Sequence, residues 1–148
     1  MNFLKNNKIQ EVLAPIALAS ATDSNSDRLD MSGYEGVIFI LPITDSVDTG
    51  VATLTIEQNT ADSDTGMAAL SGAVATATSA ANDDLNNTLL IVEVYRPLER
   101  YVQGVVTSAT ANIAYGSMVA IQYGARYVPI TQPASVKAST LVAGPAES

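Results

Sequence analysis

The stretch Asp23-Ser24-Asn25-Ser26-Asp27 places oxygen-bearing side chains close together, as the start of a calcium-binding loop does. An EF-hand loop then requires Gly at its sixth position and Glu at its twelfth. Those positions hold Arg28 and Tyr34. The EF-hand pattern therefore fails, and we interpret the stretch as a solvated turn. The sequence leaves open a weak calcium site assembled from several loops.

Other kinds of chemistry lack their usual residues. The sequence contains no His, Cys or Trp, which removes the commonest general base, the usual zinc ligands, thiol chemistry and disulfides. Gly33-Tyr34-Glu35-Gly36 is not a phosphate loop, because no Lys-Ser/Thr pair follows it. Paired carboxylates for glycoside hydrolysis remain compatible with the sequence, but a chain without Trp gives little support for a sugar-stacking cleft. We predict no enzyme, no metal site and no cofactor.

The charge of the chain is unevenly distributed. Fifteen acidic and seven basic residues give a net charge of −8, which argues against direct binding to nucleic acid. Ala21–Gly66 contains nine acidic residues and one basic residue, Arg28, while acidic and basic residues cancel outside that span. An acidic patch of one subunit facing a basic patch of a neighbour could set the orientation between them.

The neutral part of the chain contains arginines next to tyrosines, the residue types that dominate binding hot spots. Prolines in the C-terminal tail belong to the same region. The candidate interface residues are Arg96, Arg100, Arg126, Tyr101, Tyr123, Tyr127, Pro129 and Pro133. The alternative is that the tyrosines serve core or edge packing and that the arginines pair with Glu93 or Glu99.

Most of the chain has the pattern of short β-strands. Val37–Leu41 is continuously apolar, as a strand buried on both faces would be, and Val51–Gln58 alternates as a half-buried strand does. Further strands are predicted at Glu11–Ser20, Arg28–Met31, Leu89–Tyr95, Tyr101–Thr107 and Ile113–Tyr123. About seven strands at this spacing predict an all-β sandwich or barrel.

Two local features add detail to this fold. Met67, Leu70 and Val74 recur at intervals of three and four residues, which predicts a short helix within Asp64–Ala77. The connection Arg96–Glu99 is tight, which predicts a hairpin between the strands on either side of it.

The two ends are expected to form extended arms. We divide the chain into an N-terminal arm (1–10), a β domain (11–128) and a C-terminal tail (129–148), and we expect the arms to lie against other subunits. Charged residues make up 15% of the chain, against about 25% in an average soluble domain. Either partners cover part of the surface, or a Ser- and Thr-rich β surface is solvated by water.

The sequence gives no indication of a membrane segment. Its longest strongly apolar run, Val37–Leu41, is far shorter than the ~20 residues of a membrane span. Lys5 and Lys8 precede a moderately apolar stretch, as in a signal peptide, but Glu11 and Pro15 interrupt it. We expect no membrane partner, no signal peptide and synthesis in the cytoplasm.

Three blocks, in this order, resemble a family of small structural proteins of tailed bacteriophages. They are Leu29-Asp30-Met31-Ser32-Gly33-Tyr34-Glu35-Gly36-Val37-Ile38-Phe39, Tyr95-Arg96-Pro97-Leu98-Glu99-Arg100-Tyr101-Val102, and Ala120-Ile121-Gln122-Tyr123-Gly124-Ala125-Arg126 followed by Pro129. The ending Gly144-Pro145-Ala146-Glu147 is similar to the family's Ser-Pro-Ala-Glu tail, with Gly144 as a departure.

The resemblance implies a capsid decoration (cement) protein on the virion surface, made in the host cytoplasm. Such a protein would bridge subunits of the major capsid protein and associate with itself as a dimer or trimer, and the resemblance brings no catalytic residues. Alternatives are a neck, head-completion or tail structural protein, and a surface module that binds a receptor or glycan.

Overall fold

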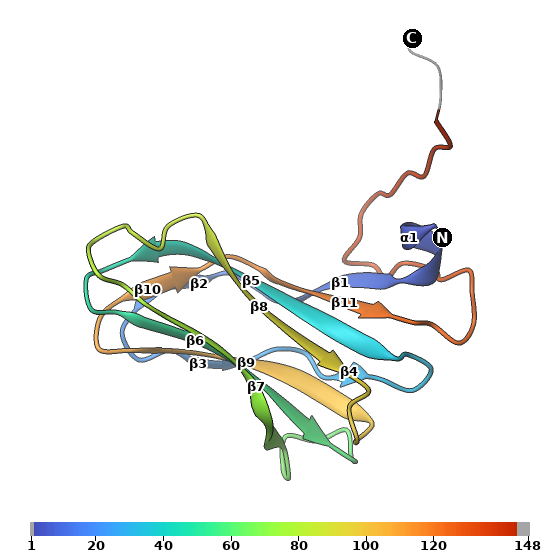
Figure 1. The fold of residues 1–148 in the computed structure, drawn as a ribbon, viewed down its shortest axis with the longest axis horizontal. Coiled ribbons are helices and arrows are strands. Elements are labelled where there is room, and N and C mark those ends of the chain that lie inside the picture. The colour runs from blue at the N-terminus through green and yellow to red at the C-terminus, as the bar shows by residue number, and fades with distance from the viewer. Residues whose placement is uncertain (1, 145–148) are drawn as a thin grey trace.

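The structure is a computed structural model that describes residues 2–144, and it is a two-layered β-sandwich with one short helix (Figure 1). The helix and strands are α1 (Phe3–Asn6), β1 (Lys8–Leu13), β2 (Ile16–Ala19), β3 (Asp23–Asn25), β4 (Leu29–Asp30), β5 (Gly36–Ser46), β6 (Val51–Asn59), β7 (Ala68–Thr78), β8 (Thr88–Tyr95), β9 (Tyr101–Ala109), β10 (Ile113–Tyr115) and β11 (Met118–Tyr123). The predicted all-β class is confirmed.

The strands form two antiparallel sheets. Sheet A has the order β1-β11-β5-β10-β2, with β8 on the other side of β5, and sheet B has the order β3-β9-β6-β7, with β4 beside β9. The two sheets lie one above the other in Figure 1, with β8 and β7 at the same side of the sandwich. Sheet A therefore includes both the longest apolar strand, β5, and the N-terminal strand β1.

The core lies between the sheets and is built from alternate residues of each strand. Phe39 and Leu41 of β5 are fully buried, as are Leu54 and Ile56 of β6. Val102 and Val106 of β9 and Met118 of β11 complete the centre. The period-two alternation of β6 is the pattern that predicted a half-buried strand, and Ala52, Leu54 and Ile56 form its buried side.

The structure has eleven strands within residues 2–144, where the sequence predicts about seven. Two predicted strands are interrupted, β7 replaces a predicted helix, and β3 lies in Asp23–Asp27, where the predicted solvated turn is wrong because Asp23–Asn25 pairs with β9. Pro15 lacks an N–H and separates β1 from β2. The predicted last strand, Ile113–Tyr123, is divided at Gly116 into β10 and β11, and the Gly116 N–H donates to the Pro42 carbonyl at 3.0 Å. Residues 8–10, which the sequence assigns to an arm, are the first half of β1.

The predicted helix within Asp64–Ala77 is wrong, because this segment contains strand β7. Thr, Ser, Gly and Val have low helix propensity, and here they pair in register with β6, with Leu54 opposite Ala75. The register breaks between Thr55 and Glu57, across from the part of β7 where Gly72 has φ +79°. The one helix of the described residues is α1, at the N-terminus.

The predicted hairpin around Arg96–Glu99 is also wrong. β8 pairs with β5 in sheet A and β9 pairs with β6 in sheet B, so the connection crosses from one sheet to the other. Two adjacent residues redirect the chain, since Arg96 has φ +52° and Pro97 has no N–H to continue the ladder. Apolar β8 instead pairs with apolar β5 along its whole length.

Strand β7 generates a test of the corrected structure. A helix would bury Val74 with Met67 and Leu70, whereas the strand leaves Val74 51% exposed. We predict that Val74→Ala changes the free energy of unfolding by less than about 0.5 kcal/mol, while Leu54→Ala lowers it by about 2–5 kcal/mol through the cavity it leaves. Urea denaturation of both variants measures this, and a cost at Val74 as large as that at Leu54 would contradict the strand.

Candidate interaction surface

Three loops that are far apart in the sequence meet at one end of the sandwich. They are Met31–Glu35 before β5, Arg96–Arg100 between β8 and β9, and Gly124–Tyr127 after β11. Backbone hydrogen bonds join them: the Arg96 N–H donates to the Glu35 carbonyl at 2.7 Å, and the Arg126 N–H donates to the Gly33 carbonyl at 2.8 Å. We call this set of loops the braced end.

Arg100 is held by a bidentate ion pair within the same chain. Its Nε and Nη2 donate to the two carboxylate oxygens of Asp30 at 3.0 and 2.9 Å, and its carbonyl accepts from the Met31 N–H at 2.8 Å. The guanidinium carbon also lies 5.3 Å from the centre of the Tyr101 ring. Arg100 therefore ties β4 to the loop between β8 and β9. The sequence left open that the arginines pair with Glu93 or Glu99, and Arg100 does form an ion pair, but with Asp30.

The hydrogen bonds from Arg100 lower the pKa of the Asp30 carboxyl from its usual value, and the Ser32 N–H adds a further hydrogen bond at 2.9 Å. A carboxyl whose pKa is lower in the folded than in the unfolded protein stabilises the fold at any pH above its pKa in the unfolded protein. This stabilisation is lost as the pH falls through the lower pKa of the folded protein. Both side chains are partly exposed, so solvent weakens the effect.

Arg96 lies in a less common conformation. Its φ of +52° is in the left-handed region, and its guanidinium is 5.0 Å from the centre of the Tyr95 ring and 3.7 Å from a Glu35 carboxylate oxygen. This turn leads directly into Leu98, which is 91% exposed at the tip of the loop. The braced end thus presents an aliphatic side chain to solvent from a loop tied at both ends.

Tyr123 is half-buried on the outer face of sheet A, where β11 reaches the braced end. Its ring lies against Gly36, where a Cβ would overlap the tyrosine hydroxyl, and its O–H donates to the Glu93 carboxylate. Burial raises the pKa of Tyr123, and Glu93 raises it further. Among the predicted interface tyrosines, Tyr123 thus makes contacts within its own chain of the kind that the packing alternative describes.

Arg126 and Tyr127 lie on the outer side of the same end. Both are exposed, and Tyr127 is 81% exposed. Tyr34 is half-buried between the loops and lines a hollow of about 410 Å³ together with Met31, Arg96 and Leu98. It also lines the adjoining hollows beside Arg126 and Tyr127.

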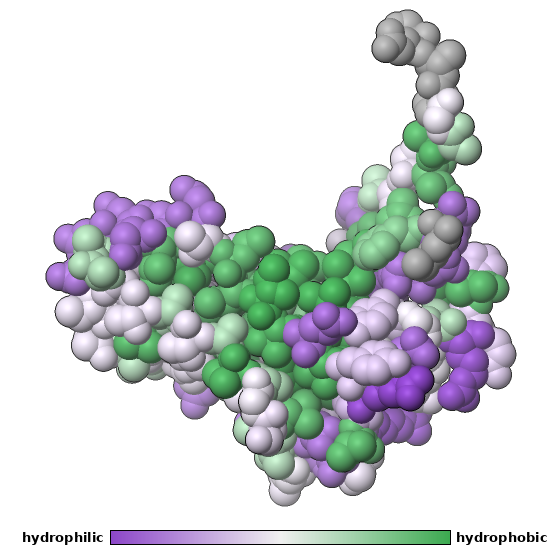
Figure 2. Space-filling model, viewed as in Figure 1, coloured by the Kyte–Doolittle hydropathy of each residue, from purple (hydrophilic) through white to green (hydrophobic). Residues whose placement is uncertain are grey.

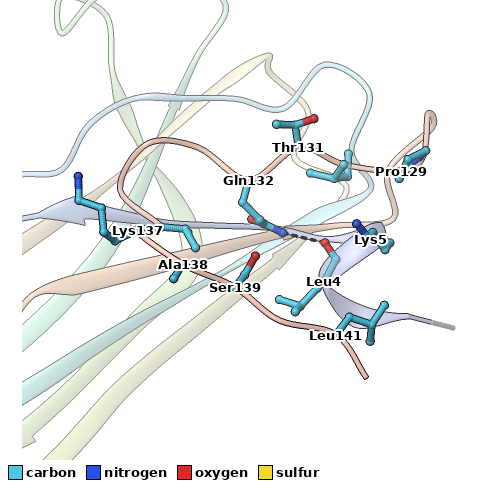
Figure 3. A pocket seen from close by; sticks show the side chains of 11 residues that line it. Leu4, Lys5, Pro129, Thr131, Gln132, Lys137, Ala138, Ser139 and Leu141 are labelled. Carbon is cyan, nitrogen blue, oxygen red and sulfur yellow. Dashed lines mark hydrogen bonds between the residues drawn. The ribbon is translucent and has the colours of Figure 1, made fainter. Parts of the chain in front are cut away.

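Pro129 and Pro133 belong to a second feature, in which the two chain ends are joined. The Gln132 side-chain N–H groups donate to the carbonyls of Leu4 (2.8 Å) and Asn7 (2.7 Å), and its Oε1 accepts from the Ile9 N–H at 2.9 Å (Figure 3). The first part of the C-terminal tail thus packs against the chain's own N-terminus, next to a pocket of about 400 Å³. Pro145, Ala146 and Glu147 of the tail resemblance lie outside the described residues.

The structure therefore brings Arg96, Arg100, Tyr101, Arg126 and Tyr127 to one end, while Pro129 and Pro133 follow as the chain turns toward the N-terminus. Sequence reasoning missed Leu98, whose signal is an aliphatic residue in a tight connection where polar residues are usual. It also missed the roles of Asp30, Tyr34 and Gln132, which depend on contacts distant in the chain.

Comparison with solved structures identifies the fold. The crystal structure of PBSX exported protein XepA aligns with 97% of this chain at 15% identity and a TM-score of 0.53. The chain shares the fold of XepA. It spans 46% of the XepA chain, so what XepA does as a whole protein is not carried over.

A structure of infectious bursal disease virus, Gt strain, aligns with 83% of this chain and 33% of its own, at 13% identity and a TM-score of 0.46, which is too low to show a shared fold. No protein-family model and no curated protein sequence matches this chain.

Within residues 2–144, no three His, Cys, Asp or Glu residues are grouped to hold a metal ion. The helix of that part of the chain is too short to span a membrane.

The Asp30–Arg100 pair gives a prediction about pH. Wild-type protein loses stability on acidification below about pH 4 partly because Asp30 becomes protonated. Asp30→Asn removes this titration, so the variant is less stable than wild type at pH 7 and the difference narrows at low pH. Thermal unfolding of both proteins from pH 7 to pH 2 measures the difference, and parallel pH curves would contradict the role of Asp30.

Gln132 gives a prediction about the chain ends. Gln132→Ala removes three hydrogen bonds that join the tail to residues 4–9, so amide exchange of residues 2–9 and 129–136 should become faster while the β6 and β9 amides stay protected. Hydrogen-exchange mass spectrometry reports both regions. Thr131→Ala, a change at an exposed neighbour, is the control and should leave both regions unchanged.

Proposed function

We propose that this chain is a virion structural protein, and specifically a capsid decoration protein that binds the major capsid protein on the outside of a phage head. The observation that carries the proposal is that all three sequence blocks of the phage resemblance converge. Residues 29–39, 95–102 and 120–129 lie far apart in the chain, yet they supply the three loops of the braced end.

The braced end has the properties of a preformed protein-binding surface. Leu98 and Tyr127 are large and exposed, and the loops that hold them are each hydrogen-bonded to the loop Met31–Glu35. Arg96 and Arg126 belong to the same two loops. Aromatic and arginine side chains dominate binding hot spots. Since the loops are already ordered in the free chain, binding would cost less conformational entropy than it would for flexible loops.

The opposite end of the sandwich supports an orientation on the shell. Strand β5 runs from the braced end at Gly36 to the far end at Ser46. The far-end loops 46–50 and 79–87 contain three acidic residues and no Lys or Arg, and Asp45 beside them is a fourth. A surface of one charge sign repels other anions. We place the braced end on the capsid and the acidic end outward, where it would discourage binding to nucleic acid.

The number of copies per virion tests the proposal. A decoration protein that covers the shell is expected at on the order of hundreds of copies on a symmetric head, whereas a neck or tail protein is expected at about a dozen. Quantitative mass spectrometry of purified virions, with a cryo-EM map of the head, gives both number and position. About a dozen copies at one vertex would contradict decoration and favour a neck or tail protein. Binding of the purified protein to a glycan array, together with no binding to capsids, would favour the glycan-binding module.

The exposed leucine gives a residue-level prediction. Leu98→Asp should weaken binding to purified undecorated capsids by at least about ten-fold, with an unchanged melting temperature because Leu98 has almost no contact with its own fold. Val74→Asp is the matched control, an exposed aliphatic residue in mid-strand rather than at the braced end. Equal capsid occupancy by the two variants would contradict the proposed binding surface.

A further inference from the structure

The two sheets differ in the side chains they turn away from the core. In sheet B, β6 turns Thr53 and Thr55 outward, and the hydroxyl of Thr53 is 3.3 Å from that of Thr76 on β7. In sheet A many of the corresponding outward positions are apolar. Six of these residues, which we call the apolar face, are Ile38 and Ile40 of β5, Leu89 and Ile91 of β8, and Val119 and Ile121 of β11.

Strand pairing makes these six residues neighbours. Ile40 lies opposite Ile91 on one side and opposite Val119 on the other, and Ile38 lies opposite Ile121. Leu89 is 55% exposed and Ile91 is 52% exposed. In Figure 2, apolar side chains gather over the middle of the body, where β5 and β8 lie in Figure 1.

An uncovered face of this kind is unusual for an antiparallel sheet. A sheet with one solvated face normally alternates apolar and polar residues, as β6 does. The outward positions of β5 are as apolar as its inward ones, which is the pattern of a strand covered on both faces. Residues 2–144 bury one face of β5, and the other face is suited to a partner.

A second apolar feature of the same chain is only partly covered by residues 2–144. The C-terminal segment, residues 136–144, starts at the rim of sheet A, where the Glu11 N–H donates to the Ser135 hydroxyl at 3.3 Å. It then leaves the body on the side of β1 and β11 (Figure 1). Leu141 and Val142 of this segment are exposed.

Charge on the two features is complementary. The carboxylates of Glu11 and Glu93 lie at outward positions of sheet A, opposite Val119 and Ile38. The C-terminal segment carries Lys137 and no Asp or Glu. The apolar C-terminal segment, which carries a cation, thus starts beside the apolar face, which carries carboxylates. The segment does not cover the apolar face of its own chain.

We propose that the apolar face of sheet A binds the C-terminal segment of a second copy of this chain, so that two copies exchange their segments in a symmetric dimer. Leu141 and Val142 of each copy would cover Ile40 and Ile91 of the other, and Lys137 would lie near Glu11 or Glu93. In a symmetric exchange, the apolar face and the C-terminal segment of each chain are both covered by the other chain. This inference is independent of the proposed binding to capsids, because it concerns the free protein.

The test uses matched aspartate substitutions in the full chain. Ile91→Asp changes the face, Leu141→Asp with Val142→Asp changes the segment, and Val74→Asp is the control with almost the same exposure as Ile91. Analytical ultracentrifugation should show a dimer for wild type and control, with a dimer dissociation constant at least about ten-fold higher for the other two variants. Circular dichroism checks folding, and Leu89→Asp replaces Ile91→Asp if the latter is unfolded.

Mixing the face and segment variants distinguishes exchange from other contacts. Each variant alone lacks both contacts, but a mixed dimer keeps one intact face and one intact segment, so the mixture should associate more tightly than either variant alone. A monomeric wild type, a face variant that still dimerises, or a mixture no tighter than its parts would each overturn the proposal. Capsid binding through Leu98 is measured separately, so either proposal can fail while the other stands.

Discussion

The structure depends on strand β5, which is hydrogen-bonded along both of its edges. Its first half pairs with β11 and its second half with β10 on one side, while β8 pairs with it along Gly36–Ile43 on the other. Its inward side chains, Phe39 and Leu41 among them, are fully buried against sheet B. Because β5 is both the centre of a sheet and the middle of the core, the strands around it have little freedom in register.

This constraint extends to the loops at the end of the sandwich. Gly36 begins β5 and provides the space for the Tyr123 ring, and the loop just before it accepts the Arg96 N–H through the Glu35 carbonyl. The positions of Arg96 and Leu98 are therefore set by the same strand that organises the core. A surface built in this way is held in place by the stability of the whole domain rather than by local contacts alone.

Sequence patterns predicted the fold class well because period-two alternation and runs of apolar residues are local signals. The strands at Val37–Leu41, Val51–Gln58 and Leu89–Tyr95 all lie where the pattern indicates. The helix at Asp64–Ala77 was wrong because Met67, Leu70 and Val74 match a helical spacing by coincidence: Met67 precedes β7, and the other two lie in β7, where its register with β6 shifts.

Partners distant in the chain could not be predicted from the sequence. The predicted hairpin at Arg96–Glu99 was wrong because a tight turn has the same sequence pattern whether it joins two paired strands or crosses from one sheet to the other. Asp30 and Arg100, which are 70 positions apart, meet only through the pairing of β4 with β9. The role of Gln132 follows likewise from the way the two chain ends come together. The low charge of the chain reflects both sheets, since β6 of sheet B turns threonines outward and β5 of sheet A turns apolar side chains outward.

The position of the two chain ends has a mechanical consequence. β1 and β11 are antiparallel, and the start of β1 lies beside the end of β11, with Lys8 opposite Gln122. Tension between the ends would therefore open this pair like a zipper, one hydrogen bond at a time, after the three bonds of Gln132 had broken. β6 and β9, in the other sheet, would carry little of that load. The outermost strand would thus act as a yielding tether, so that the ends could lengthen under strain while the rest of the sandwich stayed folded.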